Sequence, residues 1–408
     1  MADRVRRRLG EIADLNWGDT NTTKASYTPT GFLAFSATGP DGFLPYHDFD
    51  RIGVVLSAIG ANCGQTWLAR GKWSCIKNTI RFWSKSPDAD TEFLYWYTRN
   101  PDFWPRRGSA QPFISQGDAR SLFIDLPDPS TQKAIASVLG ALDDKIELNR
   151  RMNETLEAMA RAIFKDWFID FGPTRAKMEG RAPYLAPDIW SLFPDRFDEE
   201  GKPEGWEMAK LSDFMHFQGG TQPPASEFID KQSEGYVRLL QIRDFYTSSH
   251  ITFIRDTDRL RKVHVDDICI GRYGSGTGDE KDSLGRMCRG LTGAINVALV
   301  AVEPLFNCRE WLATYIGSGD FRRAVSGGSS RAVQAGFRQS DLAFVSVVRA
   351  TAEVHNAFEA IGTLVWERKK SSISENETLA ATRDFLLPKL MSGEVRVRES
   401  EKLLGEAI

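Results

Sequence analysis

Two arginine-rich segments carry the residue types in this chain that could do recognisable chemistry. Segment 99–120 holds four arginines against two aspartates, with Trp104, Gln111 and Phe113 among them. Segment 318–338 holds four arginines against one aspartate and includes Gln334. Arginine neutralises phosphates, and arginine and glutamine can also bind base edges through paired hydrogen bonds. Both segments therefore predict contact with nucleic acid.

The candidate DNA contacts come from these segments and from loops beside apolar runs. One such segment alone would more often be an ordinary solvated loop, but its presence at matching places in two halves of the chain favours a functional role. Lys24 and Arg289 are further loop candidates. The predicted DNA-binding residues are Arg106, Arg107, Gln111, Arg272, Tyr273, Arg286, Arg322, Arg323, Arg331 and Gln334.

Motifs for catalysis do not accompany these arginines. A base-flipping adenine methyltransferase needs a glycine-rich cofactor loop and an Asn/Asp-Pro-Pro-aromatic pocket, but Asp128-Pro129 continues with Ser130. The glycine-rich stretch 271–278 lacks the Lys-Ser/Thr ending of a nucleotide-binding loop. It is expected to form a tight loop whose N–H groups could approach DNA phosphates. The acidic stretch 194–202 has the wrong spacing for a metal-dependent nuclease. We expect a non-catalytic protein that binds no cofactor or metal itself.

Composition sets the limits of the molecule. With 41% hydrophobic residues, the chain can bury at least two ordinary cores. The net charge of -3 gives no global sign of nucleic-acid binding, so any such function must rest on local charge. The five cysteines are odd in number and widely spaced, which predicts free thiols in a reducing compartment. The start lacks an apolar signal core and no apolar run is long enough to span a membrane, so we expect a cytoplasmic location.

An internal duplication runs through the chain. Leu94-Tyr-Trp-Tyr97 and the following Asp102-Phe103 match Leu312-Ala-Thr-Tyr315 and Asp320-Phe321 at one offset. The sequence Asn153-Glu-Thr-Leu156 recurs unchanged from Asn376. Each match alone could be chance, but their shared order favours two similar halves.

Each half divides into a mixed globular part and a long helix. In the globular parts, the β-branched runs 52–59, 237–242 and 295–302 predict strands, and 92–98 predicts a short helix. From Ile135 to Trp167, apolar residues alternate in steps of four and three, the spacing of a coiled-coil seam. Pro129-Ser130 gives a start signal and Gly172-Pro173 a stop, for a helix of about 57 Å.

A second helix is predicted from about residue 355 to 387, with Pro388 ending or kinking it. The two helices can bury their apolar stripes against each other. Asn149, Asn153 and Asn376 fall either on the seam, where a buried amide fixes register, or at its solvent edge. The predicted packing residues are Leu139, Leu142, Ile146, Leu156, Ile163, Phe358, Ile361, Val365, Leu379 and Leu386.

The predicted fold class is α+β. It has two similar mixed α/β globular domains separated by two long antiparallel coiled-coil helices, in an internal pseudo-two-fold repeat. The connector between the halves is dense in Pro, Gly and acidic residues. The predicted boundaries are 1–128 for the first domain, 129–178 for the central helix, 179–205 for the connector, 206–349 for the second domain, 350–395 for the distal helix and 396–408 for the tail.

These features resemble the specificity subunit of type I restriction-modification enzymes. The helix running from Gln132-Lys-Ala-Ile to Asn153-Glu-Thr-Leu156 is similar to the central conserved helix of that family. Lys202-Pro-Glu-Gly-Trp-Glu207 resembles the opening of a target-recognition domain, and Leu386-Leu-Pro-Lys-Leu resembles the end of the distal helix. The first half lacks the Pro-Glu-Gly-Trp opening, and the second helix reads His355-Asn-Ala-Phe in place of Gln-Lys-x-Ile.

The resemblance implies a subunit that binds double-stranded DNA and performs no chemistry. Each globular part would bind one half of a bipartite, asymmetric site, and the helices would set the unread spacer. Two modification subunits, carrying S-adenosylmethionine, and two restriction subunits, using ATP and Mg, would be its partners. The alternatives are a coiled-coil scaffold that binds proteins without DNA specificity and a single-chain methyltransferase-recognition fusion, which the missing cofactor loop disfavours.

Overall fold

The computed structural model of the chain describes residues 4–247, 250–274, 282–327 and 335–397. These residues form two compact units. Unit 1 combines Met1–Asn149 with Ser374–Ile408, and unit 2 is Arg150–Ile373. The long helices α4 (Pro129–Phe164) and α9 (Ala352–Ser392) each contribute to both units.

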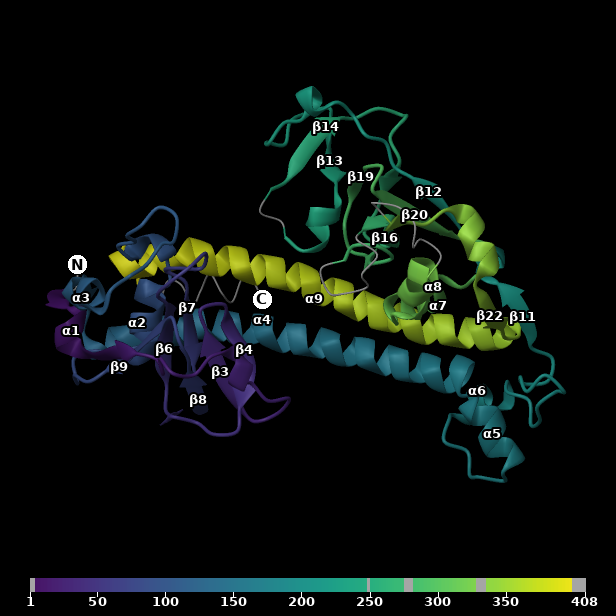
Figure 1. Cartoon of the computed structure of the whole chain (residues 1–408), viewed down its shortest axis with the longest axis horizontal. Coiled ribbons are helices and arrows are strands. Elements are labelled where there is room, and N and C mark those ends of the chain that lie inside the picture. Colours follow the sequence, from purple (N-terminus) through teal and green to yellow (C-terminus); the bar gives the residue numbers. More distant parts are fainter. Residues whose placement is uncertain (1–3, 248–249, 275–281, 328–334, 398–408) are drawn as a thin grey trace. The chain divides into compact units, whose positions relative to one another are not determined.

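Unit 1 contains a globular lobe, here called lobe 1 (residues 4–128), and the adjoining parts of α4 and α9 (Figure 1). Its described residues form sheets with strand orders β1-β10, β2-β9-β6-β7 and β4-β3-β8-β5. The elements of lobe 1 are β1 (Val5–Arg8), α1 (Leu9–Ile12), β2 (Ala13–Trp17), η1 (Lys24–Ser26), β3 (Phe32–Ser36), β4 (Gly39–Leu44), β5 (Phe49–Asp50), β6 (Gly53–Ser57), β7 (Thr66–Ala69), β8 (Lys72–Cys75), β9 (Thr79–Ser84), α2 (Thr91–Thr98), η2 (Pro101–Phe103), α3 (Gln116–Ser121) and β10 (Phe123–Leu126).

Unit 2 contains lobe 2 (described residues of 206–349), the connector and the remaining parts of α4 and α9. Its described residues form sheets with orders β11-β22, β12-β20-β16-β18, β14-β13-β19-β15 and β17-β21. The elements are the π-helical turn η3 (Lys165–Ile169), α5 (Gly172–Met178), α6 (Pro187–Ser191), β11 (Glu207–Lys210), η4 (Leu211–Asp213), β12 (Met215–Gly219), η5 (Ala225–Glu227), β13 (Tyr236–Leu240), η6 (Ile242–Phe245), β14 (Thr252–Arg255), β15 (Lys262–Val263), β16 (Cys269–Gly271), β17 (Tyr273–Gly274), β18 (Met287–Cys288), β19 (Gly293–Ile295), β20 (Leu299–Pro304), α7 (Arg309–Gly317), α8 (Asp320–Gly327), β21 (Ala335–Gly336), η7 (Gln339–Phe344) and β22 (Ser346–Arg349).

The two lobes share one topology. The order β2-β9-β6-β7 of lobe 1 is repeated as β12-β20-β16-β18 in lobe 2, and β4-β3-β8-β5 is repeated as β14-β13-β19-β15. Each second sheet contains a parallel pair at the same place, β3 with β8 and β13 with β19. Since order and strand direction are both repeated, the predicted α+β fold with two similar lobes and long helices is confirmed.

The start of α4 is determined by a local cap. Asp128 accepts hydrogen bonds from the Thr131 backbone N–H at 3.0 Å and the Thr131 hydroxyl at 2.6 Å. Hydrogen bonds from Ser130 first, and then from Thr131, lower the pKa of Asp128 to about 2. A carboxylate at this position also interacts favourably with the helix dipole, so the Asp-Pro-Ser-Thr sequence starts the helix at Pro129.

Proline ends neither long helix. The α4 helix passes into the π-helical turn η3 and stops at Phe171, whose φ of +53° is left-handed, before Gly172-Pro173 begins α5. The sequence left open whether Pro388 ends or kinks the distal helix, and α9 continues to Ser392, so the proline does not end it. Pro388 removes one backbone donor close to the end, and Leu390 beyond it is 1% exposed in the core of unit 1.

Within each unit, α4 and α9 pack antiparallel. In unit 1, Asp143 contacts Arg383 at 2.5 Å, and Asn149 donates to Asn376 at 2.9 Å. In unit 2, Arg368 reaches the sulfur of Met152 at 3.7 Å, and the rings of Phe164 and Phe358 lie 5.8 Å apart. The helix ends also join the cores of the lobes: Leu139 packs with lobe 1, and Phe358 packs with Trp311 of lobe 2.

One local prediction needs correction. The predicted strand 295–302 is divided between β19 and β20, because Asn296 forms a turn in which its side chain accepts from the Ala298 N–H. Phe193 of the connector is 3% exposed and, with Trp206 directly after the connector, joins the core of unit 2. In the part of the chain that the structure describes, no helix is long and apolar enough to cross a membrane.

Candidate nucleic-acid interface

A tight hairpin presents the first predicted arginines on lobe 1. The N–H groups of Arg107 and Phe113 each donate to the other residue's carbonyl, at 2.9 and 2.8 Å. Between them, Gly108 has a φ of +80°, and a side chain there would lie 2.9 Å from the Gln111 carbonyl oxygen. The turn therefore requires glycine, and Arg106, Arg107 and Gln111 are left exposed on its outside.

Arg106 and Arg107 of the hairpin each form an ion pair with an aspartate, and a DNA phosphate could take the place of that aspartate. Arg106 contacts Asp102 at 2.5 Å, with both side chains well exposed, and Arg107 pairs with Asp118. A hydrogen bond from Ser115, and then the Arg107 charge, lower the pKa of Asp118, so it is ionised at neutral pH. Exposed ion pairs contribute about 0–1 kcal/mol. Replacing the carboxylate with a DNA phosphate would therefore cost the protein little.

The remaining arginines of segment 99–120 have structural roles. Arg99 pairs with Asp143 of α4 at 2.8 Å, and Arg120 donates to the Leu15 carbonyl at 2.6 Å. Segment 99–120 thus contains both candidate DNA contacts and residues that attach lobe 1 to α4.

In lobe 2 the predicted residues gather around one short segment, 282–285. Arg322 donates to the Asp282 and Leu284 carbonyls at 3.1 and 3.3 Å, and Arg286 donates to the Asp282 carbonyl at 3.4 Å. The Ser283 hydroxyl donates to the carbonyl of Tyr273 at 2.7 Å. Residues far apart in the sequence are therefore brought to one surface region.

Aromatic rings lie beside two of these guanidinium groups. Arg272 lies 5.3 Å from the ring of Tyr273, and Arg286 lies 5.1 Å from the ring of Tyr246, which is 49% exposed. Contact with an aromatic ring restricts the positions that a guanidinium group can take, and the group keeps its donors for bases or phosphates. This arrangement suits nucleic-acid contact better than isolated loop arginines would.

Arg323 is the exposed predicted residue on α8. Its side chain is 75% exposed and pairs with Asp320 one turn earlier. Arg331 and Gln334 lie outside the described residues. Arg289, in contrast, is 6% exposed and held by Glu310, so its place among the DNA-contact candidates is wrong.

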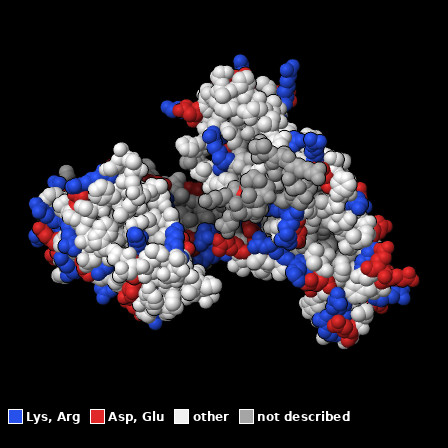
Figure 2. All heavy atoms as spheres, viewed as in Figure 1, with Lys and Arg blue, Asp and Glu red and all other residues white. Residues whose placement is uncertain are grey.

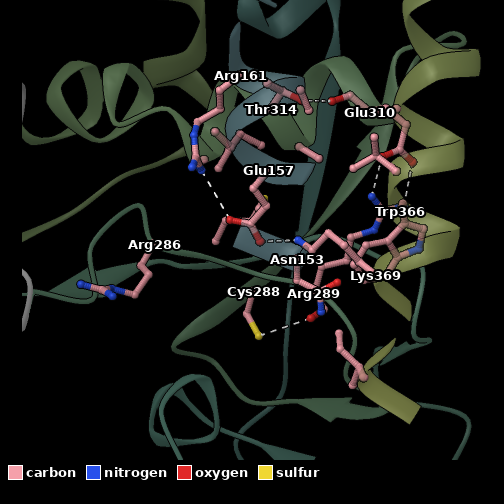
Figure 3. A pocket seen from close by; sticks show the side chains of 18 of the residues that line it. Asn153, Glu157, Arg161, Arg286, Cys288, Arg289, Glu310, Thr314, Trp366 and Lys369 are labelled. Carbon is pink, nitrogen blue, oxygen red and sulfur yellow. Dashed lines mark hydrogen bonds and ion pairs between the residues drawn. The ribbon is translucent and has the colours of Figure 1, made fainter. Parts of the chain in front are cut away.

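A groove of about 550 Å³ lies beside the 282–285 region, within unit 2. Figure 3 shows Arg161 and Glu157 of α4, Lys369 of α9 and Glu310 of α7 around this space. Glu157 pairs with both Lys369 and Arg161. Figure 2 shows Lys and Arg mixed with Asp and Glu where lobe 2 meets the long helices. The basic side chains there are thus largely compensated, in keeping with the small net charge of the whole chain.

The predicted packing residues separate by depth. Leu139, Leu142, Phe358, Leu379 and Leu386 are 0–3% exposed. The other predicted packing residues are partly buried: Ile146, Leu156, Ile163, Ile361 and Val365. The fully buried positions lie toward the helix ends, where the lobes add a third surface, and the middle of the helix pair is more polar.

The buried thiols offer no reactive group. All five cysteines are free. Burial raises the pKa of Cys75, Cys269 and Cys308 to about 12, and that of Cys288 to about 11, so these thiols stay protonated. Among the described residues, no group of three or more His, Cys, Asp or Glu side chains is arranged to hold a metal ion.

Sequence reasoning missed two arginine–glutamate pairs, one in each lobe, whose arginines also contact a long helix. Arg70 pairs with Glu92 at 2.9 Å in lobe 1, and Arg289 pairs with Glu310 at 2.7 Å in lobe 2. In each lobe the arginine precedes a glycine, and the glutamate is the second residue of a short helix. That repeated Arg-Gly pattern was the available signal.

The structure thus defines a protein with two lobes of the same topology, two long helices, and arginines exposed on each lobe. Residues 1–158 match the family model for the type I restriction modification DNA specificity domain. The chain is 26% identical over 348 residues to the specificity subunit of the type I restriction enzyme HindI from Haemophilus influenzae, covering 71% of this chain and 72% of that protein.

The specificity subunit of the type I restriction enzyme MjaIX from Methanocaldococcus jannaschii is 23% identical over 314 residues. That match covers 72% of this chain and 65% of the relative, slightly under two thirds of its length. The type I restriction-modification S subunit from M. genitalium has the same fold, with a TM-score of 0.60 at 16% identity over 95% of this chain and 96% of that one. Over most of its length the chain is thus similar to type I restriction-modification specificity subunits, and residues 1–158 match the model of their DNA specificity domain.

Proposed function

We propose that this chain is the sequence-specific DNA-binding subunit of a type I restriction-modification complex and is itself non-catalytic. Each lobe binds one half of a bipartite, asymmetric site in double-stranded DNA. The observation that carries the proposal is the repeated topology of the lobes together with exposed arginines on each, Arg106 and Arg107 on lobe 1 and Arg323 on lobe 2. Two similar lobes with different surface residues suit two different half-sites.

Partner subunits supply the chemistry in this proposal. Two modification subunits bind S-adenosylmethionine and methylate adenine, and two restriction subunits use ATP and Mg. Exposed apolar side chains on the long helices support docking there. Leu148 and Phe385 are 60% and 55% exposed in unit 1, and Met159 and Leu364 are 54% and 74% exposed in unit 2. Large apolar side chains left exposed on a helix favour a protein partner.

A methylation map tests the proposal directly. Host DNA is sequenced for methyladenine with the gene present, deleted and restored. The expected result is that one interrupted, asymmetric motif loses methylation on deletion and regains it on restoration. An unchanged map in cells that make the modification subunit would overturn the proposal and favour a protein-binding scaffold.

A further inference from the structure

In lobe 2, a buried ion pair joins three elements. Arg289, directly after the edge strand β18, donates to both carboxylate oxygens of Glu310 in α7, at 2.7 and 2.8 Å. The two side chains are 6% and 9% exposed. The other side of the guanidinium lies 3.9 Å from the ring of Trp366 in α9. The pair therefore joins the edge of a lobe sheet, a lobe helix and the long helix.

Further contacts fix the same crossing of α7 and α9. Glu359 of α9 accepts hydrogen bonds from the N–H groups of Glu310 and Trp311, at 2.9 and 2.8 Å, and so caps the start of α7. At Gly362 the helices approach so closely that a Cβ would lie 2.4 Å from the Cβ of Glu310. Neither helix can slide along or turn about the other without breaking these contacts.

Lobe 1 contains a similar arrangement, in which an arginine after an edge strand contacts a glutamate of a lobe helix and a residue of a long helix. Arg70, directly after the edge strand β7, contacts Glu92 of α2 at 2.9 Å and Asp144 of α4 at 2.8 Å. The glycines that follow the two arginines, Gly71 and Gly290, are both left-handed, with φ of +68° and +97°. Because the same arrangement of arginine, glutamate and left-handed glycine occurs in both lobes, chance is a poor explanation for it.

The two pairs differ in exposure. Arg70 and Glu92 are 46% and 31% exposed, so salt and water screen them, whereas Arg289 and Glu310 are screened little. Breaking a buried pair also leaves an uncompensated charge, which is far more costly than losing an exposed pair. Removing one partner of the lobe 2 pair should therefore cost more than removing one partner of the lobe 1 pair.

We propose that Arg70–Glu92 and Arg289–Glu310 are positioning pairs that set the angle of each lobe on its long helix and so decide which spacer length between half-sites is accepted. This inference rests on the proposed DNA-binding function. The pairs touch no base in this scheme. They act by presenting each reading surface in one orientation.

The test uses matched glycine substitutions in the full chain, assembled with its modification subunits. Gly362→Ala raises the helix propensity of α9 but forces α7 away from it. Gly140→Ala is the control, because a Cβ at Gly140 of α4 has no heavy atom within 4 Å among the described residues outside its own helix turn. Each complex methylates a DNA library in which the half-sites are fixed and the spacer length varies.

The expected result is that Gly362→Ala lowers methylation at the native spacer at least about tenfold relative to neighbouring lengths, whereas Gly140→Ala matches the parent. Tenfold corresponds to about 1.4 kcal/mol. Arg70→Met, at a more exposed site where misfolding is not expected, should widen the accepted spacers in the same assay. Arg196→Ala, which removes the exposed pair with Glu204 in the connector, is its control.

The outcomes separate the two proposals. If the parent complex methylates no specific motif, the proposed DNA-binding function fails. If the parent is specific, and both Gly362→Ala and Arg70→Met keep its spacer preference while folded, the positioning inference is wrong. A loss of half-site discrimination with an unchanged spacer would also overturn it, because the pairs would then act on base reading.

Discussion

Gln132 and His355 occupy equivalent positions near the starts of α4 and α9. Each donates its N–H four residues back, Gln132 to Asp128 at 3.0 Å and His355 to Thr351 at 3.1 Å. Gln132 is fully buried, and its amide makes three hydrogen bonds to the backbone of lobe 1. His355 is 2% exposed, and neither ring nitrogen has a hydrogen-bond partner among the described residues. His355 therefore places a neutral ring, without hydrogen bonds to the described part of the chain, where the equivalent Gln132 of α4 bonds to the backbone of the lobe.

Acid should destabilise unit 2 through His355. Burial, and then the Arg349 charge, lower the pKa of His355 to about 4. Since the unfolded residue binds its proton near pH 6.5, the unfolded state gains it first, and stability falls as pH drops from about 6.5 to 4. The full loss is about 3 kcal/mol. In thermal unfolding, His355→Leu should flatten this pH dependence and the exposed-site control His264→Ala should not. Equal slopes in all three proteins would contradict the assignment.

DNA affinity should depend on arginines that can be removed without harming the fold. Arg107→Ala and Arg323→Ala remove exposed side chains, whereas Arg322→Ala would also remove the bonds to Asp282 and Leu284. Each exposed substitution should weaken binding and lower the slope of log K against log salt by about 0.9 per lost phosphate contact. Binding by the assembled complex is measured from low to moderate salt, with Arg196→Ala as control. Unchanged slopes would remove these residues from the interface.

The residue types in the sequence predicted which segments would expose arginines. They did not predict which of the candidate arginines would instead form ion pairs within the fold. Arg107 and Arg99 belong to one segment and look alike in sequence, yet one lies on an exposed hairpin and the other pairs with Asp143 of α4. The same is true of Arg323 and Arg289. The difference depends on tertiary packing, since Arg99 and Arg289 each pair with a carboxylate in another element of the fold.

Among the elements, the middle of the helix pair depends on a buried amide. Asn149 is 1% exposed and donates to Asn376 at 2.9 Å and to Glu375 at 2.8 Å. Of the two interpretations left open by the sequence, the seam position is the right one for this residue. Such a residue costs stability compared with an apolar one but fixes the register of the helices.

Asn149→Ala should therefore destabilise unit 1 by about 1 kcal/mol, because the half-buried amide oxygen of Asn376 and the carboxylate of Glu375 each lose a hydrogen bond. The double substitution Asn149→Leu with Asn376→Leu should recover stability while loosening the register. Urea unfolding measures the first effect, and a cross-link between cysteines placed at facing positions measures the second. Thr155→Ala, on an exposed face of α4, should change stability by less than about 0.5 kcal/mol. A destabilised double variant would show that packing, and not hydrogen bonding, governs this site.

Elements with strong periodicity were predicted well, and those without it were not. The three-four spacing and the Pro129-Ser130 start signal identified the first residue of α4, whereas nothing in the sequence indicated that the helix passes into a π-helical turn after Phe164. Pro, Gly and acidic residues gave no sign that Phe193 of the connector is buried in the core of unit 2. Pro388 does not end α9, and Leu390 beyond it is buried in the core of unit 1.

At the scale of the whole molecule, duplication was the most informative feature of the sequence. Matches such as Asn153-Glu-Thr-Leu156 with Asn376-Glu-Thr-Leu379 predicted two similar lobes, and the repeated strand orders confirm them. The strand pairing itself could not be predicted, because it joins runs as distant as β2 with β9 and β12 with β20. The sequence of a short apolar strand does not indicate which other strand it pairs with.

Helix length offers the last prediction, because α4 and α9 both run through both units. Removing one heptad from the centre of each, residues 147–153 of α4 and 370–376 of α9, keeps the seam in phase and shortens each helix by about 10 Å. That length corresponds to about three base pairs at 3.4 Å each. The complex should then methylate the same half-sites with a spacer about three base pairs shorter. Removing the heptad from α4 alone breaks the pairing and should abolish specific methylation. Altered half-sites with an unchanged spacer would mean that the helices do not measure the site.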